Sequence, residues 1–356
     1  MTANRPEPRT ARHRRRWDGG IAPREAQRGV ALLVAIMLVA LGTILAAAMA
    51  YNNAMTARRA AATFDFDQAL LIVQGAEALA AYGLRQQNPP SSQYTSPSQS
   101  WSQPLPPTEV LPGVTLEASL EDLQGRFNIN DLVEQDGRTP NNVAILAFQR
   151  LLGILKLDHP EWADDIVDWI DNSPTAMVAN GAEDSVYLEL DPPYRTPKLP
   201  VTSTSELLAL PGMTRAAFDT LAPHIVALPI GTQINVCSAD PWVLDALAGV
   251  VQYSADPQGF EKDREAQPPC FPTQTEFLSA AQNVEASSAQ GGIGTVTNGV
   301  NQSPQPTLAS LLVQRSSWFR LTSFVNVGAT EFAVYTLLYE DSTGMVRPVM
   351  RSFTPD

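Results

Sequence analysis

The most constraining feature of this chain is an uncharged apolar stretch that directly follows a basic segment. Residues 30–50 read VALLVAIMLVALGTILAAAMA, and the next charged residue is Arg58. About 20 apolar residues are enough for a helix to cross a bilayer, so this stretch requires lipid or partner helices around it. The segment before it contains Arg12, Arg14, Arg15, Arg16, Arg24 and Arg28. By the positive-inside rule, this basic end stays in the cytoplasm and the remainder is exported.

Three interpretations of this junction remain open. The stretch is the core of a secretory signal peptide, cleaved near the three alanines at 46–48, because signal peptidase requires small residues. Alternatively, it is a plain N-terminal membrane anchor. In the third interpretation, cleavage falls between Gly29 and Val30, as in type IV prepilins, and the helix is kept for anchoring and assembly. The abrupt change from glycine to a purely apolar run favours the third.

The charge distribution agrees with an exported chain. The 356 residues carry a formal net charge of −13, and the basic residues 1–29 contribute +5, which leaves −18 for the remainder. An acidic exported part argues against nucleic acid as a partner, because phosphates require a basic surface. Hydrophobic residues make up 44% of the sequence, which is enough for a buried core and argues against disorder.

Cys237 and Cys270 are the two cysteines of the chain. An even pair in an exported protein favours a disulfide, and the alternative is two separate buried thiols. A disulfide here would contribute about 3–4 kcal/mol by the chain-entropy estimate.

The apolar stretch continues into an amphipathic one. From Met55 to Leu84 the sequence favours helix and contains no proline. Apolar residues recur at spacings of three and four, as one buried helix face requires: Phe66, Ala69, Leu70, Val73, Ala76 and Ala80. The sequence therefore predicts one helix of about 50 residues, apolar all round in its first half and amphipathic in its second. Glu77 is expected to face solvent or a partner.

Four segments predict one antiparallel sheet. Residues 88–107 are rich in Pro, Ser and Gln and are typical of a linker. Apolar and polar residues alternate at 114–120, as in a half-buried strand, and three further strands are predicted at 318–327, 331–339 and 345–353.

The region between these strands is mainly helical. Helices are predicted at 141–155, 159–172, 205–210, 214–228 and 240–251, and Asp240 is the expected N-cap of the last. Residues 281–308 are rich in Gln, Gly, Asn and Ser and are expected to be flexible. The predicted fold class is α+β, in which a long N-terminal helix accompanies an antiparallel sheet and a large α-helical domain is inserted in that sheet.

An acidic cluster lies in this helical region. Asp164, Asp168 and Asp171 are spaced four and three apart, so a helix places them near one face, and further acids follow at Glu183, Asp184 and Asp191. Oxygen ligands from a helix end and the following loop suit Ca²⁺, which takes six to eight oxygens. A solvated acidic face is the alternative, since no EF-hand spacing is present.

Catalysis and DNA binding find little support. Residues 205–225 resemble a helix-hairpin-helix around an LPG turn, but the acidic exported part favours simple helix packing. The sequence contains no G-x-S-x-G, H-E-x-x-H or phosphate-binding loop, so it predicts a non-enzymatic protein.

Several motifs together resemble minor pseudopilin K of bacterial type II secretion systems. Residues 28–33 (RGVALL) are similar to its prepilin peptidase site, and residues 122–130 (DLQGRFNIN) to its D-x-x-G-R-F-N-[LI]-N signature. Further matches follow in the family's order: DWID at 168–171, GAEDSVY at 181–187, PYR at 193–195, SEL at 205–207 and INV at 234–236. The fifth residue after the cleavage site is Val34, and this family typically lacks the glutamate that most pilins carry there.

The resemblance implies a pilin-like fold, in which the long helix packs on the sheet. The expected organisation is a leader peptide at 1–29, an N-terminal membrane and assembly helix at 30–87, a linker at 88–109, a sheet formed by 110–131 and 314–356, and an inserted α-helical domain at 132–313.

It also implies a structural subunit that caps the pseudopilus tip with minor pseudopilins I, J and H, and that helps to start assembly and secretion across the outer membrane. Prepilin peptidase would cleave after Gly29 and methylate Val30. The protein would be single-pass in the inner membrane with its bulk in the periplasm, where secreted substrates and the secretin are further candidate partners. A single-pass anchored periplasmic ligand-binding protein is the alternative, and the state of the N-terminus distinguishes the two.

Calcium binding by the inserted domain is a further implication of the resemblance. It assigns Asp171, Glu183 and Asp184 as the first ligands, followed by Asp168 and Asp191. Two positions depart from the family pattern. Ser173 stands where an acid is frequent, and Cys237 stands where asparagine is usual.

Overall fold

The computed structural model of the protein describes residues 25–173, 178, 181–249, 253, 256–289 and 307–354. It consists of two units, residues 1–64 and residues 65–356. Each unit is described here by itself. Residues 1–24 of the predicted leader lie outside the described residues.

The first unit contains the N-terminal part of helix α1 (Glu25–Gln87). Its side chains from Val30 to Phe64 are almost all exposed. Within the described residues, α1 is the one helix that is long and apolar enough to cross a membrane. It has 63 residues and begins at Glu25, so it is longer than predicted.

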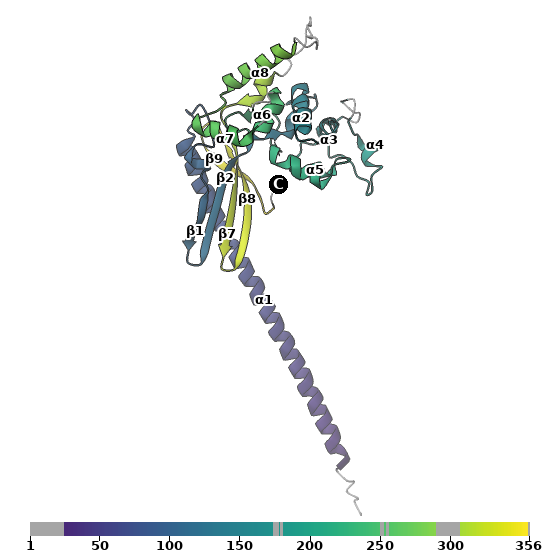
Figure 1. Ribbon diagram of the computed structural model, residues 1–356. Helices are drawn as coiled ribbons and strands as arrows, with labels where there is room; N and C mark the ends of the chain where they lie inside the picture. Colours follow the sequence, from purple (N-terminus) through teal and green to yellow (C-terminus); the bar gives the residue numbers. More distant parts are fainter. Residues whose placement is uncertain are drawn as a thin grey trace, which may run out of the picture. The chain divides into compact units, whose positions relative to one another are not determined.

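The second unit is built on a five-stranded antiparallel sheet with the order β1-β2-β7-β8-β9 (Figure 1). The four predicted strands are confirmed as β2 (Val114–Asp122), β7 (Trp318–Val327), β8 (Thr330–Glu340) and β9 (Val346–Ser352). Although β2 and β7 are far apart in sequence, they pair over nine consecutive residues, from Val114↔Val327 to Asp122↔Phe319. This pairing closes the sheet across the whole inserted domain.

The predicted linker at 88–109 is wrong at its C-terminal end. Strand β1 (Leu105–Leu111) begins there and pairs with β2. Pro106 and Pro107 obscured this strand, but proline is tolerated on an edge strand because one side of that strand needs no N–H donors. The remainder of the segment is also packed, since Thr95, Ser96 and Trp101 are buried.

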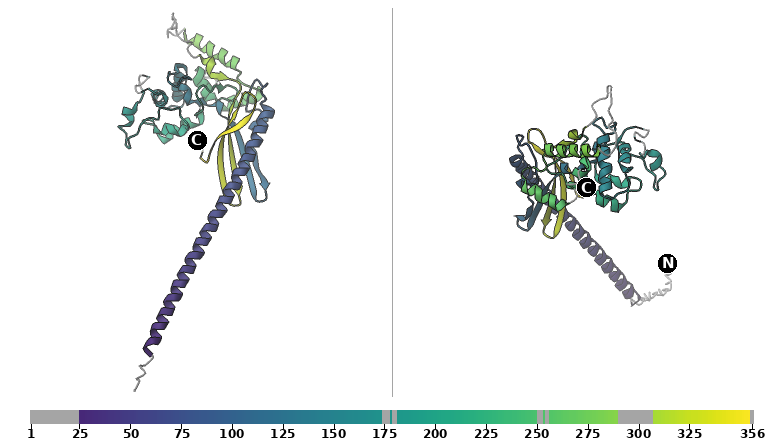
Figure 2. Two further views of the ribbon diagram at one scale, coloured as in Figure 1. Left: turned by 180° about the vertical axis from the view of Figure 1, so that it is seen from behind. Right: turned by 45° about the horizontal axis from the view of Figure 1, so that its top comes forward.

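The C-terminal part of α1, residues 65–87, lies along one face of the sheet (Figure 2). The predicted stripe is confirmed, because Ala69, Val73 and Ala76 are buried in a core shared with sheet residues that include Leu116, Phe319, Val325 and Leu338. Burying this apolar face is the main force that holds the helix to the sheet.

Glu77 was expected to face solvent or a partner, and that expectation is wrong. Its side chain is 6% exposed and accepts hydrogen bonds from Nε and Nη2 of Arg351 on β9, at 2.6 and 2.7 Å. Thr336 on β8 donates a third bond at 3.0 Å. A buried carboxylate requires such partners, and here the protein's own sheet supplies them.

The inserted domain leaves the sheet after β2 and returns before β7 (Figure 1). Its regular elements are short: β3 (Phe127–Asn128), α2 (Asn142–Ile154), α3 (Trp162–Ile170), α4 (Asp184–Tyr187), α5 (Arg215–Leu221), β4 (Ile225–Val226), β5 (Ile234–Asn235), α6 (Pro241–Ala248), α7 (Pro257–Ala266), α8 (Gln274–Ala289) and β6 (Leu312–Val313), with 3-10 turns between them. They surround a separate core that contains Phe127, Phe148, Trp162 and Ile166.

Several predicted boundaries in this domain need correction. The insertion begins near residue 123 rather than 132, because Phe127 and Ile129 belong to its core. The helix predicted at 214–228 ends at Leu221, before Pro223. The chain then forms β4, which pairs in parallel with β3. Pro223 has no N–H with which to continue the α-helical hydrogen bonds, and the chain passes through a 3-10 turn (Ala222–His224) before β4, which explains the early end.

Other helix predictions had mixed outcomes. Those at 141–155 and 240–251 are confirmed as α2 and α6, and Asp240 caps α6 by accepting a bond from the N–H of Val243 at 2.9 Å. The helix predicted at 205–210 is instead a 3-10 turn (Thr204–Ala209). The predicted flexible stretch at 281–308 is helical up to Ala289 in α8. Residues 290–306 lie outside the described residues.

Candidate functional site

Helix α3 carries the first of the predicted metal ligands. Asp164 and Asp165 occupy its first turn, where negative charge is favoured by the helix dipole. Asp171 is the C-cap that follows Ile170, since its ψ of 147° is extended while its N–H still donates to the carbonyl of Val167 at 2.9 Å. All nine residues of α3 are buried, so the helix presents its acids inside the domain rather than to solvent.

Three of the predicted ligands come together. One carboxylate oxygen from each of Asp168, Asp171 and Glu183 lies within 4.8 Å of the others. Asp168 and Asp171 are 0% exposed. Oδ2 of Asp171 and Oε1 of Glu183 are buried and have no hydrogen-bond partner among the described residues. Burial raises the pKa of Asp171, and hydrogen bonding from the Ser173 N–H opposes this effect.

Gly181 brings the following loop against this cluster. A Cβ atom at this position would lie 1.7 Å from Oδ2 of Asp168, so a larger residue would push the loop and Glu183 away from α3. This close approach is the physical reason for glycine at the start of the GAED motif.

The cluster also contains a lysine that the sequence analysis missed. Nζ of Lys198 donates to Oε2 of Glu183 at 2.8 Å and to the backbone carbonyl of Asp168 at 2.9 Å, and it lies 3.7 Å from Oδ1 of Asp171. The sequence did contain a hint that this lysine pairs with the acids. The chain has three lysines, and Lys198 follows shortly after the acids at 164–171 and 183–191.

The structure does not bring Asp184 and Asp191 into the cluster. Asp184 instead accepts bonds from Nη1 of Arg195 at 2.8 Å and from the N–H and Oγ1 of Thr196, both at 3.1 Å. Asp191 is exposed. Asp184 of the GAED motif and Arg195 of the PYR motif therefore tie the loop back on itself, and the same loop buries Tyr187 against Trp169.

The three clustered carboxylates fit a hard divalent cation. They supply oxygen donors, which Ca²⁺ prefers, and two of their buried oxygens lack partners within the described chain. Buried polar groups usually have partners, so these free oxygens are unusual enough to require an explanation.

The D-x-x-G-R-F-N signature forms the junction between the sheet and the inserted domain. Asp122, at the end of β2, is buried and accepts bonds from Asn235 at 3.0 Å, from Ser316 at 2.6 Å and from Ser238. Burial raises its pKa and these donors lower it. A Cβ on Gly125 would lie 2.5 Å from the carbonyl oxygen of Ser238, so the two chain segments meet as closely as glycine allows.

The asparagines of the same signature hold the irregular part of the domain. Nδ2 of Asn130 donates to the carbonyls of Val201 and Leu228, both at 2.8 Å, and its Oδ1 accepts from the N–H of Val201 at 2.8 Å. Asn128 accepts from the N–H of Leu228 at 3.0 Å. Both side chains are buried, so this part of the motif acts as structural support.

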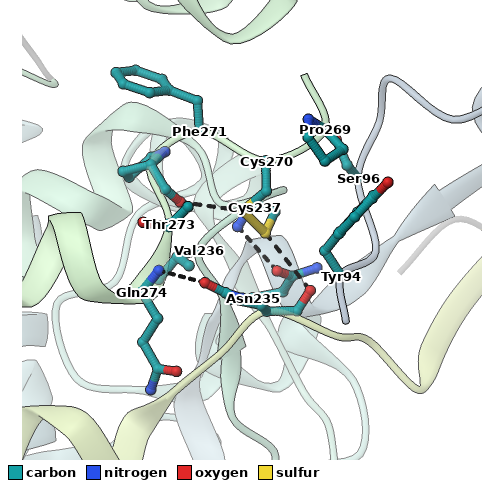
Figure 3. Close-up of a disulfide and its surroundings, with 12 residues drawn as sticks. Tyr94, Ser96, Asn235, Val236, Cys237, Pro269, Cys270, Phe271, Thr273 and Gln274 are labelled. Atoms are coloured by element: carbon teal, nitrogen blue, oxygen red, sulfur yellow. Dashed lines mark hydrogen bonds between the residues drawn. A yellow bond between two sulfur atoms is a disulfide. The ribbon is translucent and has the colours of Figure 1, made fainter. Parts of the chain in front are cut away.

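Cys237 and Cys270 are joined by a disulfide (Figure 3). The bond connects the residue after β5 and Val236 to the loop between α7 and α8. Cys237 also donates its N–H to Oδ1 of Asn235 at 3.0 Å. Arg264 of α7 fastens the same loop, since its Nε donates to the carbonyl of Phe271 at 3.0 Å. The disulfide therefore ties the α7–α8 segment to the polar junction around Asn235.

The predicted processing residues, Gly29 and Val30, lie in the first turns of α1. Val30 is 65% exposed. Cleavage between them stays a prediction.

Comparison with known proteins identifies the family. A model of "Type II secretion system (T2SS), protein K" matches residues 125–230. The type II secretion system protein K of Klebsiella pneumoniae is 31% identical over 271 residues, which cover 74% of this chain and 76% of that protein. The chain therefore belongs to the type II secretion system protein K family. The protein K of Pseudomonas aeruginosa is also 31% identical, over 63% of this chain and 69% of its own length.

The fold is likewise that of protein K. A crystal structure of the GspK-GspI-GspJ complex from enterotoxigenic Escherichia coli matches with a TM-score of 0.65 and 22% identity, covering 83% of this chain and 98% of that one. The segment matched by the protein K model contains the carboxylate cluster and Asn130. Cys237 and Cys270 lie beyond it.

Proposed function

We propose that this protein K is the minor pseudopilin that caps the tip of the type II secretion pseudopilus and helps to start its assembly. The observation that carries the proposal is the position of the insertion. The insertion leaves the sheet at Asp122. The C-terminal end of α1 lies at this same end of the sheet, because Asn88, the residue after α1, donates to Glu340 at the end of β8 at 2.9 Å. A bulky domain at the C-terminal end of α1 would block the addition of another subunit above it.

Minor pseudopilins I, J and H are the proposed partners. Support comes from the structural relative, a GspK solved in a complex with GspI and GspJ. The inserted domain would be the part available to secreted substrates or to the secretin. Co-purification tests the assembly: the full chain, extracted in detergent from cells that also express I and J, should retain both. Recovery of the chain alone from such cells would contradict the proposed tip complex.

The apolar part of α1 suggests the route into the fibre. Prepilin peptidase would cleave after Gly29 and methylate Val30. The inner membrane would hold the helix, with the bulk of the chain in the periplasm, until the helix packs into a bundle of partner helices. Val34 stands where a buried glutamate would need a partner from a neighbouring subunit, and a tip subunit has no neighbour above it.

The intact mass of the protein from membranes with active prepilin peptidase tests this route. We expect a species that begins at methylated Val30. An uncleaved species, in cells where the peptidase processes another prepilin, would instead favour a single-pass anchored periplasmic binding protein.

We further propose that Asp168, Asp171 and Glu183 bind Ca²⁺. Millimolar Ca²⁺ should raise the melting temperature of the full chain in detergent relative to chelator, and Asp171→Ala combined with Glu183→Ala should abolish the rise. Asp191→Ala is the matched control, because this exposed acid lies outside the cluster. The absence of a rise in the wild type would remove calcium from the proposal.

A further inference from the structure

We infer that Lys198 is a built-in counter-ion of the carboxylate cluster, which holds the three acids together without metal and competes with a divalent cation for their oxygens. The first part of this inference stands on the geometry alone. The second part rests on the proposed calcium site, and the experiment below separates the two.

The ammonium of Lys198 lies against the three clustered acids. Its hydrogen bonds to Oε2 of Glu183 and to the carbonyl of Asp168 are 2.8 and 2.9 Å long, and Oδ1 of Asp171 lies 3.7 Å away. An ammonium has three donors, and two of them are used here on groups that come from both sides of the cluster. The side chain is only 19% exposed, so this is a partly buried arrangement rather than a surface ion pair.

The fold forces Lys198 into this place. Its φ of 54° lies in the left-handed region, which is uncommon for residues other than glycine and costs backbone energy. The segment is fixed on both sides, since Thr196 donates to Asp184 and Val201 exchanges two hydrogen bonds with Asn130. A strained residue fixed between two anchors indicates that the lysine is positioned rather than loosely attracted.

The ammonium and a bound Ca²⁺ would repel each other. Oδ2 of Asp171 and Oε1 of Glu183, which have no hydrogen-bond partner among the described residues, belong to the same carboxylates whose other oxygens face Nζ. An ion about 2.3–2.6 Å from those free oxygens would therefore lie close to Nζ, and two positive charges that near each other repel strongly. This repulsion would push Lys198 aside when a metal enters. Its flexible four-carbon stem permits this movement. The lysine thus keeps the metal-free cluster in place and weakens the binding of calcium.

Two lysine-to-methionine variants test this competition. Lys198→Met removes the charge and keeps most of the stem. Lys156→Met is the matched control, because Lys156 is exposed and has a closely similar φ of 59°, so the strain of the left-handed backbone is the same in both. The full chain in detergent is stripped of metal with chelator, and Ca²⁺ alone is then titrated by calorimetry. The melting temperature is recorded in chelator and in millimolar Ca²⁺.

We expect Lys198→Met to bind Ca²⁺ at least about tenfold more tightly than the wild type and to melt several degrees lower in chelator, whereas Lys156→Met matches the wild type in both. A Lys198→Met protein that binds Ca²⁺ no more tightly than the wild type overturns the inference. A wild type that binds no Ca²⁺, together with a variant that does, supports the inference and contradicts only the proposed calcium binding of the wild type.

Lys198→Arg distinguishes loss of charge from loss of side-chain packing, because it keeps the positive charge. It should melt close to the wild type in chelator, and a loss as large as that of Lys198→Met would overturn the counter-ion role. If Lys198→Met does not fold in either condition, Lys198→Gln takes its place, with the same outcomes deciding.

Discussion

The sheet with its packed helix and the inserted domain are stabilised in different ways. In the sheet, β7 and β8 pair through ten consecutive residues, and an apolar face packs on α1. In the inserted domain, the four described strands are two residues long. Buried polar side chains there form hydrogen bonds with backbone groups that neighbouring strands would satisfy in a larger sheet. Loss of one polar side chain should therefore affect the inserted domain much more than the sheet.

The reason is the requirement that buried backbone groups be hydrogen-bonded. In the sheet, neighbouring strands meet this requirement whatever the side chains are. In the inserted domain, irregular segments such as those around Val201 and Leu228 have asparagine side chains as their partners. Each of these side chains is suited to one local arrangement, so it is difficult to replace.

Removal of the disulfide should give the largest difference between the two regions. Cys237→Ser combined with Cys270→Ser should lower the free energy of unfolding of the inserted domain by about 3–4 kcal/mol, because the open loop regains entropy in the unfolded chain. Hydrogen exchange of the full chain in detergent reports both regions separately. If protection in β7 and β8 falls as much as in α6 and α7, the two regions do not behave independently.

The next largest effect is expected from an asparagine. Asn130→Ala leaves three buried backbone groups without a partner and should cost about 3 kcal/mol in the inserted domain. Asn326 on β7 is only half-buried, and Asn326→Ala should cost no more than about 0.5 kcal/mol. Denaturant titration of the two variants checks the difference. Equal costs would remove the proposed contrast.

The difference between the two regions is not absolute, because α1 and the sheet are also joined by the buried hydrogen bonds between Glu77 and Arg351. Glu77→Gln should cost about 1–2 kcal/mol, and the value is moderate because the side chain of Arg351 is 36% exposed. Glu331→Gln, an exposed position on β8, is the control and should have no measurable effect. The same denaturant titration applies, and a Glu77→Gln variant as stable as this control would show that apolar packing alone holds α1.

A further expected difference between the two regions depends on pH. Burial raises the pKa of Asp131 in the inserted domain from 3.8 to about 7. Between these values the folded state binds more protons than the unfolded state, so the stabilisation from this group is complete below about pH 4 and is lost as the pH rises through 7. Asp131→Asn should flatten the pH dependence by at most about 1.4 kcal/mol per pH unit. Parallel slopes for variant and wild type between pH 4 and 7 would exclude this assignment.

Much of the sheet region was predictable, because its patterns are local. Alternation in β2, β7 and β8 and the stripe on α1 each require only a few neighbouring residues to be read. Strand β1 was missed because its two prolines are compatible only with an edge strand. Which strand lies at the edge depends on the order of all the strands, and the sequence of one segment does not reveal that order. The parallel pair β3–β4 was missed for a similar reason, since its two short strands come from distant parts of the chain.

The candidate site was only partly predictable. Spacing along α3 placed Asp168 and Asp171 near one face, and the resemblance to the protein K family pointed to Glu183. The same reasoning also selected Asp184 and Asp191, which the structure leaves outside the cluster. These acids lie in a loop and in the first turn of the one-turn helix α4, where no periodicity fixes the direction of a side chain, so they could not be sorted from the sequence.

The sequence by itself determined the membrane-compatible helix, the acidic exported part, most of the strands and the family motifs, because these depend on composition and short-range spacing. Only the tertiary structure decided that Glu77 turns inward to Arg351, that Asn130 supports the inserted domain, and that Lys198 lies among three carboxylates. In each case a charged or polar side chain finds its partner across a long stretch of chain, and which groups meet there depends on how the whole chain packs.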